Sequence, residues 1–136
     1  MPAPTAVPAL YAGFGCRRGC PADVLETLLR QGLATRGLPL GALHGIASID
    51  LKADEGGLQA LAQRLALPLV VFTAVQLQAF ESQLSHRSAA AFAHSGCWGV
   101  AESSALAFAG QAGGVPRLLL PRQILGPATL ALACHR

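Results

Sequence analysis

Apolar and polar positions in the first half of the chain follow two alternating patterns. Short apolar runs at Val7 to Tyr11, Ile46 to Asp50 and Leu69 to Phe72 are typical of buried strands. Between them, apolar side chains recur at helical spacing: Val24, Leu25, Leu28, Leu29 and Leu33 in one stretch, Leu58, Leu61 and Leu65 in the next. With a third helix from about Ala74, the order predicts a parallel sheet with helices packed on its faces.

Residues that typically begin or end helices occur near the ends of these segments. Pro21 suits a first helical position, Gly37 suits the position just after a helix end, and Asp54 can cap the second helix. Before the first helix, Gly13-Phe14-Gly15 predicts a tight glycine turn after the first strand.

The second half of the chain changes character. Alanine-rich stretches predict helices over 84–94 and 101–109. Two apolar runs follow, at 118–120 and 129–133, and their connection is too short for a crossover helix, so they should pair antiparallel. We therefore expect a three-layer α/β/α fold with a mixed, mostly parallel sheet of about five strands. It should form one domain over 1–136, with residues 1–6 as a flexible N-terminus.

Composition narrows the class of protein. Hydrophobic residues make up 52% of 136 and charged residues 12%, which excludes a disordered or fibrous chain. The net charge of +3 is too small to indicate nucleic acid, and neither a membrane-spanning stretch nor a secretion signal is evident, so a cytoplasmic protein is expected. Cys16, Cys20, Cys97 and Cys134 are expected as free thiols. The four histidines show no metal-binding spacing, and we expect neither a metal nor a cofactor.

The first candidate for chemistry is the segment Gly13-Phe14-Gly15-Cys16-Arg17-Arg18-Gly19-Cys20. A glycine-rich loop between a strand and a helix favours an anion, and two arginines reinforce that preference. The alternative is a tight turn with solvated arginines. Its glycine spacing matches neither a dinucleotide fingerprint nor a P-loop. The Cys16 thiol should favour its thiolate beside the arginines, although a nucleophile needs a base that the sequence does not show.

The second candidate is the charged segment Asp50-Leu51-Lys52-Ala53-Asp54-Glu55. The chain has ten cationic and seven acidic side chains in all, and four of these charges lie within these six residues. A helix cap with a solvated loop is the simple alternative. Because parallel strands end at the same edge of a sheet, we expect this segment beside the arginine loop, lining a shared cleft. Glu102 opens a helix, where an acid is ordinary.

These segments resemble a known family. Gly13 to Gly19 is similar to a G-[IL]-G-C-R-R-G loop, and Ile49 to Glu55 to an [ST]-I-D-L-K-A-D-E segment, of the CobE/CbiG C-terminal domain family of cobalamin biosynthesis. Gly99 to Ala105 looks like that family's G-V-x-S-V-A-E-A-A-A stretch. The resemblance extends from Ala9 to Ala133 and fits the short members, which lack the N-terminal domain of the longer hydrolases.

The resemblance implies a part in corrin ring formation, with a carboxylate-rich precorrin or corrinoid intermediate as ligand and other enzymes of corrin synthesis as further partners. Arginine forks and an apolar floor from Phe14 and Leu51 would suit such a ligand. The expected ligand-binding residues are Gly13, Phe14, Gly15, Cys16, Arg17, Arg18, Gly19, Asp50, Lys52, Asp54, Glu55 and Glu102. No nucleic acid or membrane partner is expected.

Three functions stay open at this stage. The first is a binder or carrier of the intermediate, which needs only the cationic loops. The second is a hydrolase that opens the ring lactone and releases acetaldehyde, with Asp50, Asp54 or Glu102 as the base and Arg17 or Lys52 at the oxyanion. A nucleotide- or phosphate-binding protein is the third, and it leaves the charged segment without a role.

Overall fold

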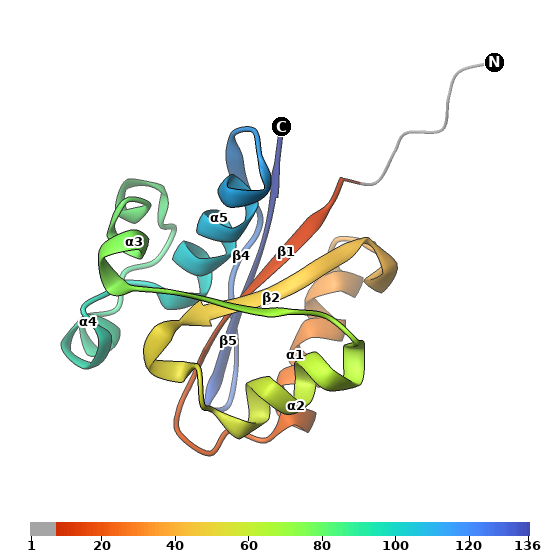
Figure 1. The fold of residues 1–136 in the computed structure, drawn as a ribbon, viewed down its shortest axis with the longest axis horizontal. Helices are drawn as coiled ribbons and strands as arrows, with labels where there is room; N and C mark the ends of the chain where they lie inside the picture. Colours follow the sequence, from red (N-terminus) through yellow and green to blue (C-terminus); the bar gives the residue numbers. More distant parts are fainter. Residues whose placement is uncertain (1–7) are drawn as a thin grey trace.

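Five strands form one mixed sheet in the computed structural model, which describes residues 8–136. Their spatial order is β3 (Leu69–Phe72), β2 (Leu43–Ile49), β1 (Leu10–Cys16), β5 (Ala128–His135) and β4 (Pro116–Leu125). The β1–β2 and β2–β3 pairs are parallel, whereas β5 pairs antiparallel with both β1 and β4 (Figure 1). The mixed sheet and the antiparallel final pair are confirmed. Two of the four strand pairs are parallel, so the sheet is partly rather than mostly parallel.

Helices cover both faces of the sheet, which confirms the three layers (Figure 1). One face carries α1 (Ala22–Thr35) and α2 (Gly56–Leu65). The other carries α5 (Val100–Ala112), with α3 (Ala74–Gln78) beside it and α4 (Ala89–Ser95) further out. Short 3-10 turns occupy Leu40–Ala42, Asp50–Lys52 and Glu81–Gln83. No helix within 8–136 is long and apolar enough to cross a membrane.

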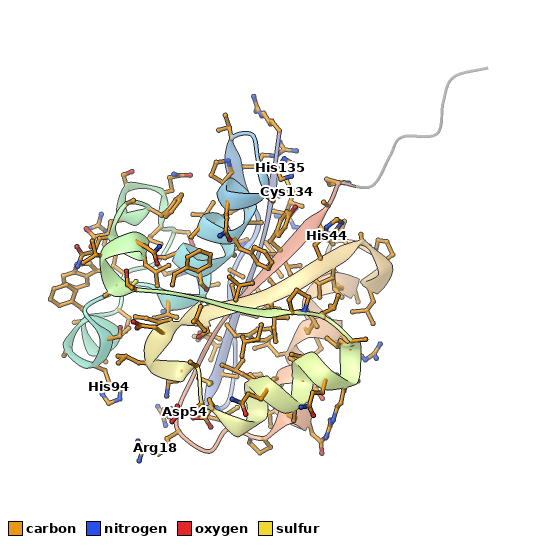
Figure 2. All side chains as sticks on the ribbon, viewed as in Figure 1. Arg18, His44, Asp54, His94, Cys134 and His135 are labelled. Atoms are coloured by element: carbon orange, nitrogen blue, oxygen red, sulfur yellow. The ribbon has the colours of Figure 1, made fainter. Side chains whose placement is uncertain are left out.

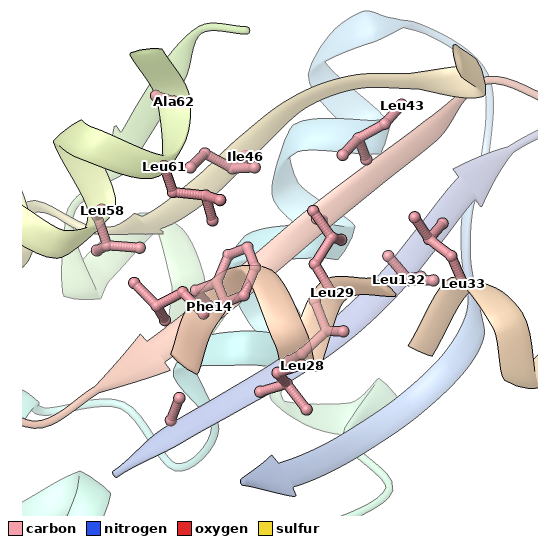
Figure 3. Close-up of a cluster of buried hydrophobic side chains, with 14 of the residues drawn as sticks. Phe14, Leu28, Leu29, Leu33, Leu43, Ile46, Leu58, Leu61, Ala62 and Leu132 are labelled. Atoms are coloured by element: carbon pink, nitrogen blue, oxygen red, sulfur yellow. The ribbon is translucent and has the colours of Figure 1, made fainter. Parts of the chain in front are cut away.

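The side chains of alternate residues in β1 point to opposite faces of the sheet. Leu10, Ala12 and Phe14 enter the core that α1 and α2 close, part of which Figure 3 shows. Tyr11 packs on the other side, in the cluster beneath α5. Gly13 lies on the same side as Tyr11. It faces α5 so closely that a Cβ there would lie 2.0 Å from the backbone oxygen of Ala101. The predicted glycine turn at 13–15 is wrong, because these residues belong to β1 and Gly13 lets α5 pack against the strand.

Several element boundaries differ from the prediction. β1 begins at Leu10 rather than Val7 and continues to Cys16; the expectation for residues 1–6 lies outside the described residues. The helix predicted over 84–94 begins only at Ala89, where Ser88 caps it. β4 runs through Pro121, which an edge strand tolerates because it leaves one side of the ladder unpaired.

The first two helices were predicted more closely. Pro21 stands at the N-cap of α1, one position before the expected one. Gly37 follows the helix end with a φ of 62°, and the amides of Gly37 and Leu38 donate to the last turn, a Schellman ending. Glu55, and not Asp54, is the N-cap of α2.

Candidate functional site at the carboxyl edge of the sheet

The carboxyl ends of β1, β2 and β3 meet at one edge of the sheet, at the lower left of Figure 1. The turn between β4 and β5 joins this edge, because the Arg17 amide donates to the Pro127 carbonyl at 2.9 Å. The first residue of α5 lies there too: a Cβ on Gly15 would come within 3.8 Å of the Val100 Cβ. Five segments of the chain therefore share this edge: the ends of three parallel strands, the β4–β5 turn and the start of α5. Ligands bind at such an edge in open α/β sheets.

The two charged loops touch each other, as the crossover argument predicts. The Gly19 amide donates to Glu55 Oε1 at 2.8 Å. Just beyond, a Cβ on Gly57 would lie 2.0 Å from the Cys20 carbonyl oxygen, so the backbones themselves are in close contact. Figure 2 shows Arg18 and Asp54 at the same end of the molecule.

Cationic side chains on this edge are left open to a ligand. Arg17 and Arg18 are exposed and Lys52 is half-buried. Among the ion pairs of residues 8–136, none includes these three side chains or the exposed Asp50 and Asp54. The edge therefore offers forked guanidinium groups that match carboxylates, with acidic groups beside them.

The backbone of the arginine loop is mostly occupied. Gly13 and Gly15 belong to the β1 ladder, and the Gly19 amide is bonded to Glu55. The Cys20 amide donates to the Arg17 carbonyl at 3.1 Å. The glycine loop is thus no open anion cradle, because an internal carboxylate already bonds to its Gly19 amide. A ligand in this conformation meets side chains rather than amides.

Phe14, one of the expected ligand-binding residues, faces inward. Phe14 is fully buried and packs in the core, so it supplies no apolar floor in this structure, whereas Leu51 is exposed.

Cys16 does not favour its thiolate. Burial raises the pKa of this thiol to about 11, Lys52 lowers it, and Cys20 and Glu55 raise it. All four cysteines are free thiols, as predicted.

A shallow, open groove of about 380 Å³ lies beside the arginine loop. It runs between the first turns of α1 and the β4–β5 turn, and its lining residues are Asp23, Val24, Thr27, Leu125, Gly126 and Pro127. The expected cleft was to be lined by the two charged loops. This hollow is instead formed by neighbours of the arginine loop.

Glu102 differs most from its expected role. Its side chain is only 1% exposed, in the first turn of α5. The amides of Ser85 and Arg122 donate to it at 2.8 and 2.9 Å, and the His86 amide at 3.4 Å. The Ser85 hydroxyl also bonds to Oε2. Both oxygens are therefore enclosed and bonded within the protein, which leaves no open side of Glu102 for a ligand in this conformation.

Ser85 and His86 were not among the candidate residues. Both side chains are exposed, and Ser85 Oγ lies 2.6 Å from Nδ1 of His86. The segment lies at the same edge, since the His86 carbonyl oxygen would be 3.3 Å from a Cβ on Gly99, just before α5. A lone serine and histidine inside a predicted helix carry no pattern that would have indicated this arrangement.

Fold and edge together describe an α/β protein with cationic loops after parallel strands and a buried carboxylate beneath the adjoining loop. The chain belongs to the family described as cobalamin synthesis G C-terminus, whose model matches residues 10–133.

Individual relatives agree with this assignment. The chain is 38% identical over 124 residues to "Protein CobE" of Sinorhizobium sp, covering 91% of this chain and 79% of that one. A crystal structure of CobE, described as a protein from the cobalamin (vitamin B12) biosynthetic pathway, superimposes with a TM-score of 0.88 at 41% identity, over 95% and 94% of the two chains. The cobalt-precorrin-5A hydrolase of Priestia megaterium is 28% identical over 124 residues, 91% of this chain but only 32% of the hydrolase.

Proposed function

We propose that this protein binds a carboxylate-rich corrin intermediate at the carboxyl edge of its sheet. The observation that carries the proposal is the pair of exposed arginines, Arg17 and Arg18, without ion-pair partners in residues 8–136 and packed beside the Lys52 loop. Corrin precursors carry acetate and propionate groups around the ring, which suit guanidinium forks. The family supplies the pathway, since its members act in cobalamin synthesis.

Binding to cobyrinic acid, a corrin with seven free carboxylates, tests this proposal. We expect saturable changes in its absorbance on titration and a loss of affinity in Arg17→Ala or Arg18→Ala. Each lost bond to a charged group should cost about 1.5–3 kcal/mol, or roughly tenfold to 150-fold in Kd. Arg36→Ala is the matched control, an exposed arginine at the far end of α1.

Circular dichroism of each variant checks that the fold is intact. The fully amidated form of the same ring separates charge from shape. Equal affinity for the acid and amide forms would refute the electrostatic account. Unchanged affinity in both arginine variants would place the site elsewhere.

Hydrolysis of a ring lactone is the second candidate function, favoured by the similarity to a cobalt-precorrin-5A hydrolase. Of the bases considered for it, Asp50 and Asp54 are exposed at the edge, whereas the oxygens of Glu102 are enclosed. Incubation with corrin lactones, followed by mass spectrometry, separates the two functions. Binding without a mass change supports a carrier, whereas uptake of one water together with loss of acetaldehyde supports the hydrolase.

A further inference from the structure

One chain of hydrogen bonds runs from the interior to the surface at the start of α5. Its inner end is the buried carboxylate of Glu102, its middle is the Ser85 hydroxyl, and its outer end is the exposed imidazole of His86. The imidazole has no role in the binding site proposed above. Whether it can act as a base depends on which ring nitrogen carries the proton.

The protons in this chain can be assigned from chemistry. A serine hydroxyl has one proton, and a carboxylate only accepts hydrogen bonds, so the Ser85 proton points to Glu102. Nδ1 of His86 must then be the donor in its bond to Ser85 Oγ. In a neutral His86 the proton therefore sits on Nδ1, and the lone pair is left on Nε2 of an exposed ring.

The inner end of this chain is held in place by backbone. Three amides, those of Ser85, His86 and Arg122, donate to Glu102. No cationic side chain of residues 8–136 forms an ion pair with it. The carboxylate is thus fixed by dipoles at a helix start, which leaves the Ser85 hydroxyl as the one side chain bonded to it among the described residues.

Arg122 contacts the same carboxylate through its backbone. The Arg122 amide and the Ser85 hydroxyl bond to the same oxygen, Oε2 of Glu102. The Arg122 guanidinium makes no hydrogen bond within residues 8–136, and its Nε is buried without a partner. Within residues 8–136, Arg122 thus carries an unpaired guanidinium on the residue whose backbone amide binds Glu102.

We propose that His86 is the general base of a hydrolytic site for carboxylic esters, lactones included, with Ser85 and Glu102 as positioning residues. Nε2 takes a proton from water while the water oxygen attacks the carbonyl carbon. The bond from that carbon to the leaving oxygen then breaks, and the proton passes from Nε2 to the leaving oxygen. A carboxylic acid and an alcohol result, and the imidazole is regenerated. This inference deepens the second candidate function above and replaces its carboxylate base.

The tautomer of His86 is the first test, and it needs no ligand. Long-range ¹H–¹⁵N correlation spectra of the labelled full chain, near pH 8, distinguish the two neutral tautomers, and His86→Ala assigns the signals. We expect the Nδ1–H form for His86 and the form usual in water for His94, an exposed histidine without a side-chain hydrogen bond in residues 8–136. Ser85→Ala should return His86 to the usual form, as should Glu102→Gln if it folds. An Nε2–H tautomer in the unmodified protein would overturn the proposal.

Esterolysis is the second test, with 4-nitrophenyl acetate as the probe. General bases contribute about 10²- to 10⁴-fold in evolved sites, so we expect His86→Ala to lower the rate by about tenfold or more with this simple ester. Added imidazole should restore part of the rate in His86→Ala, after subtraction of the hydrolysis that imidazole causes without protein. His94→Ala should match the unmodified protein. Equal rates with and without His86 would refute the catalytic role. Because neither test contains a corrin, failure here is distinguishable from failure of corrin binding.

Discussion

Cys16 ends β1 immediately before two arginines, yet its thiol is a weaker acid than an exposed cysteine. Burial removes water from the thiolate and raises the pKa to about 11, against the opposing charge of Lys52. Cys20 and Glu55 add to the rise. Desolvation therefore prevails over the cationic surroundings that the sequence emphasises, and Cys16 is a poor nucleophile at neutral pH.

Alkylation of Cys16 by iodoacetamide should therefore keep accelerating with pH. Only the thiolate reacts, so the rate should rise about tenfold per unit from about pH 7 to about pH 10 without a plateau. Lys52→Ala should slow the reaction at each pH, because that lysine lowers the thiol pKa. Mass spectrometry of the Cys16 peptide measures the rate.

The same chain unfolded in urea serves as the control, since its thiols should level off near their ordinary pKa of about 8.5. A plateau at that pH in the folded protein would contradict the effect of burial.

At the scale of elements, local patterns were sufficient where neighbours in sequence decide the structure. β3 has its predicted bounds, and α1 nearly so, because periodicity and end signals lie within each segment. β1 and α4 were misplaced for a shared reason. α5 packs directly against Gly13 of β1, and Glu102 in α5 holds the amides of Ser85 and His86 out of a helix.

The candidate site, too, could be predicted from the sequence only in part. The side-by-side placement of the charged loops followed from strand order alone, and it is confirmed. The Glu102–Ser85–His86 chain joins the loop at 85–86 to α5 through a bond between residues 17 positions apart, so no local pattern indicates it.

The contact between β1 and α5 predicts a large effect of one methyl group. In Gly13→Ala the added Cβ would meet the backbone of Ala101 and Ala105, which cannot rotate away. We expect a loss of about 1–3 kcal/mol in the free energy of unfolding, measured by urea denaturation. Gly56→Ala is the matched control, because a Cβ there meets nothing within 4 Å at the start of α2.

That control should be neutral or stabilising by up to about 1 kcal/mol, since alanine reduces the entropy of the unfolded chain. Comparable stability of the two variants would mean that α5 can shift away from β1 at little cost.

Across the whole molecule, the last strand in sequence lies inside the sheet. β5 separates β1 from β4, and its residues alternate between the two cores. Leu130 and Leu132 pack toward α1 and α2, while Ala131 and Ala133 pack toward α5. Both layers of helices thus depend on one strand, which makes cooperative unfolding of the domain the expected behaviour.

A chain shortened to end at Gly114 should therefore lack a stable fold. It would keep every helix and all three parallel strands, but lose β4 and β5 and expose both cores. We expect no cooperative urea transition by circular dichroism and little amide dispersion by NMR, in contrast to the full chain. A sigmoidal transition in the shortened chain would show that the parallel half is an independent folding unit.

The position of β5 also has a consequence during synthesis. The ribosome synthesises β1, β2, β3 and all of the helices before it reaches β5, the strand that pairs with β1. Until then β1 is an open edge, able to pair with strands of neighbouring nascent chains. The interval between the synthesis of β3 and that of β5 is therefore the period in which this chain most needs a chaperone, and slow codons for residues 73–127 would lengthen that period.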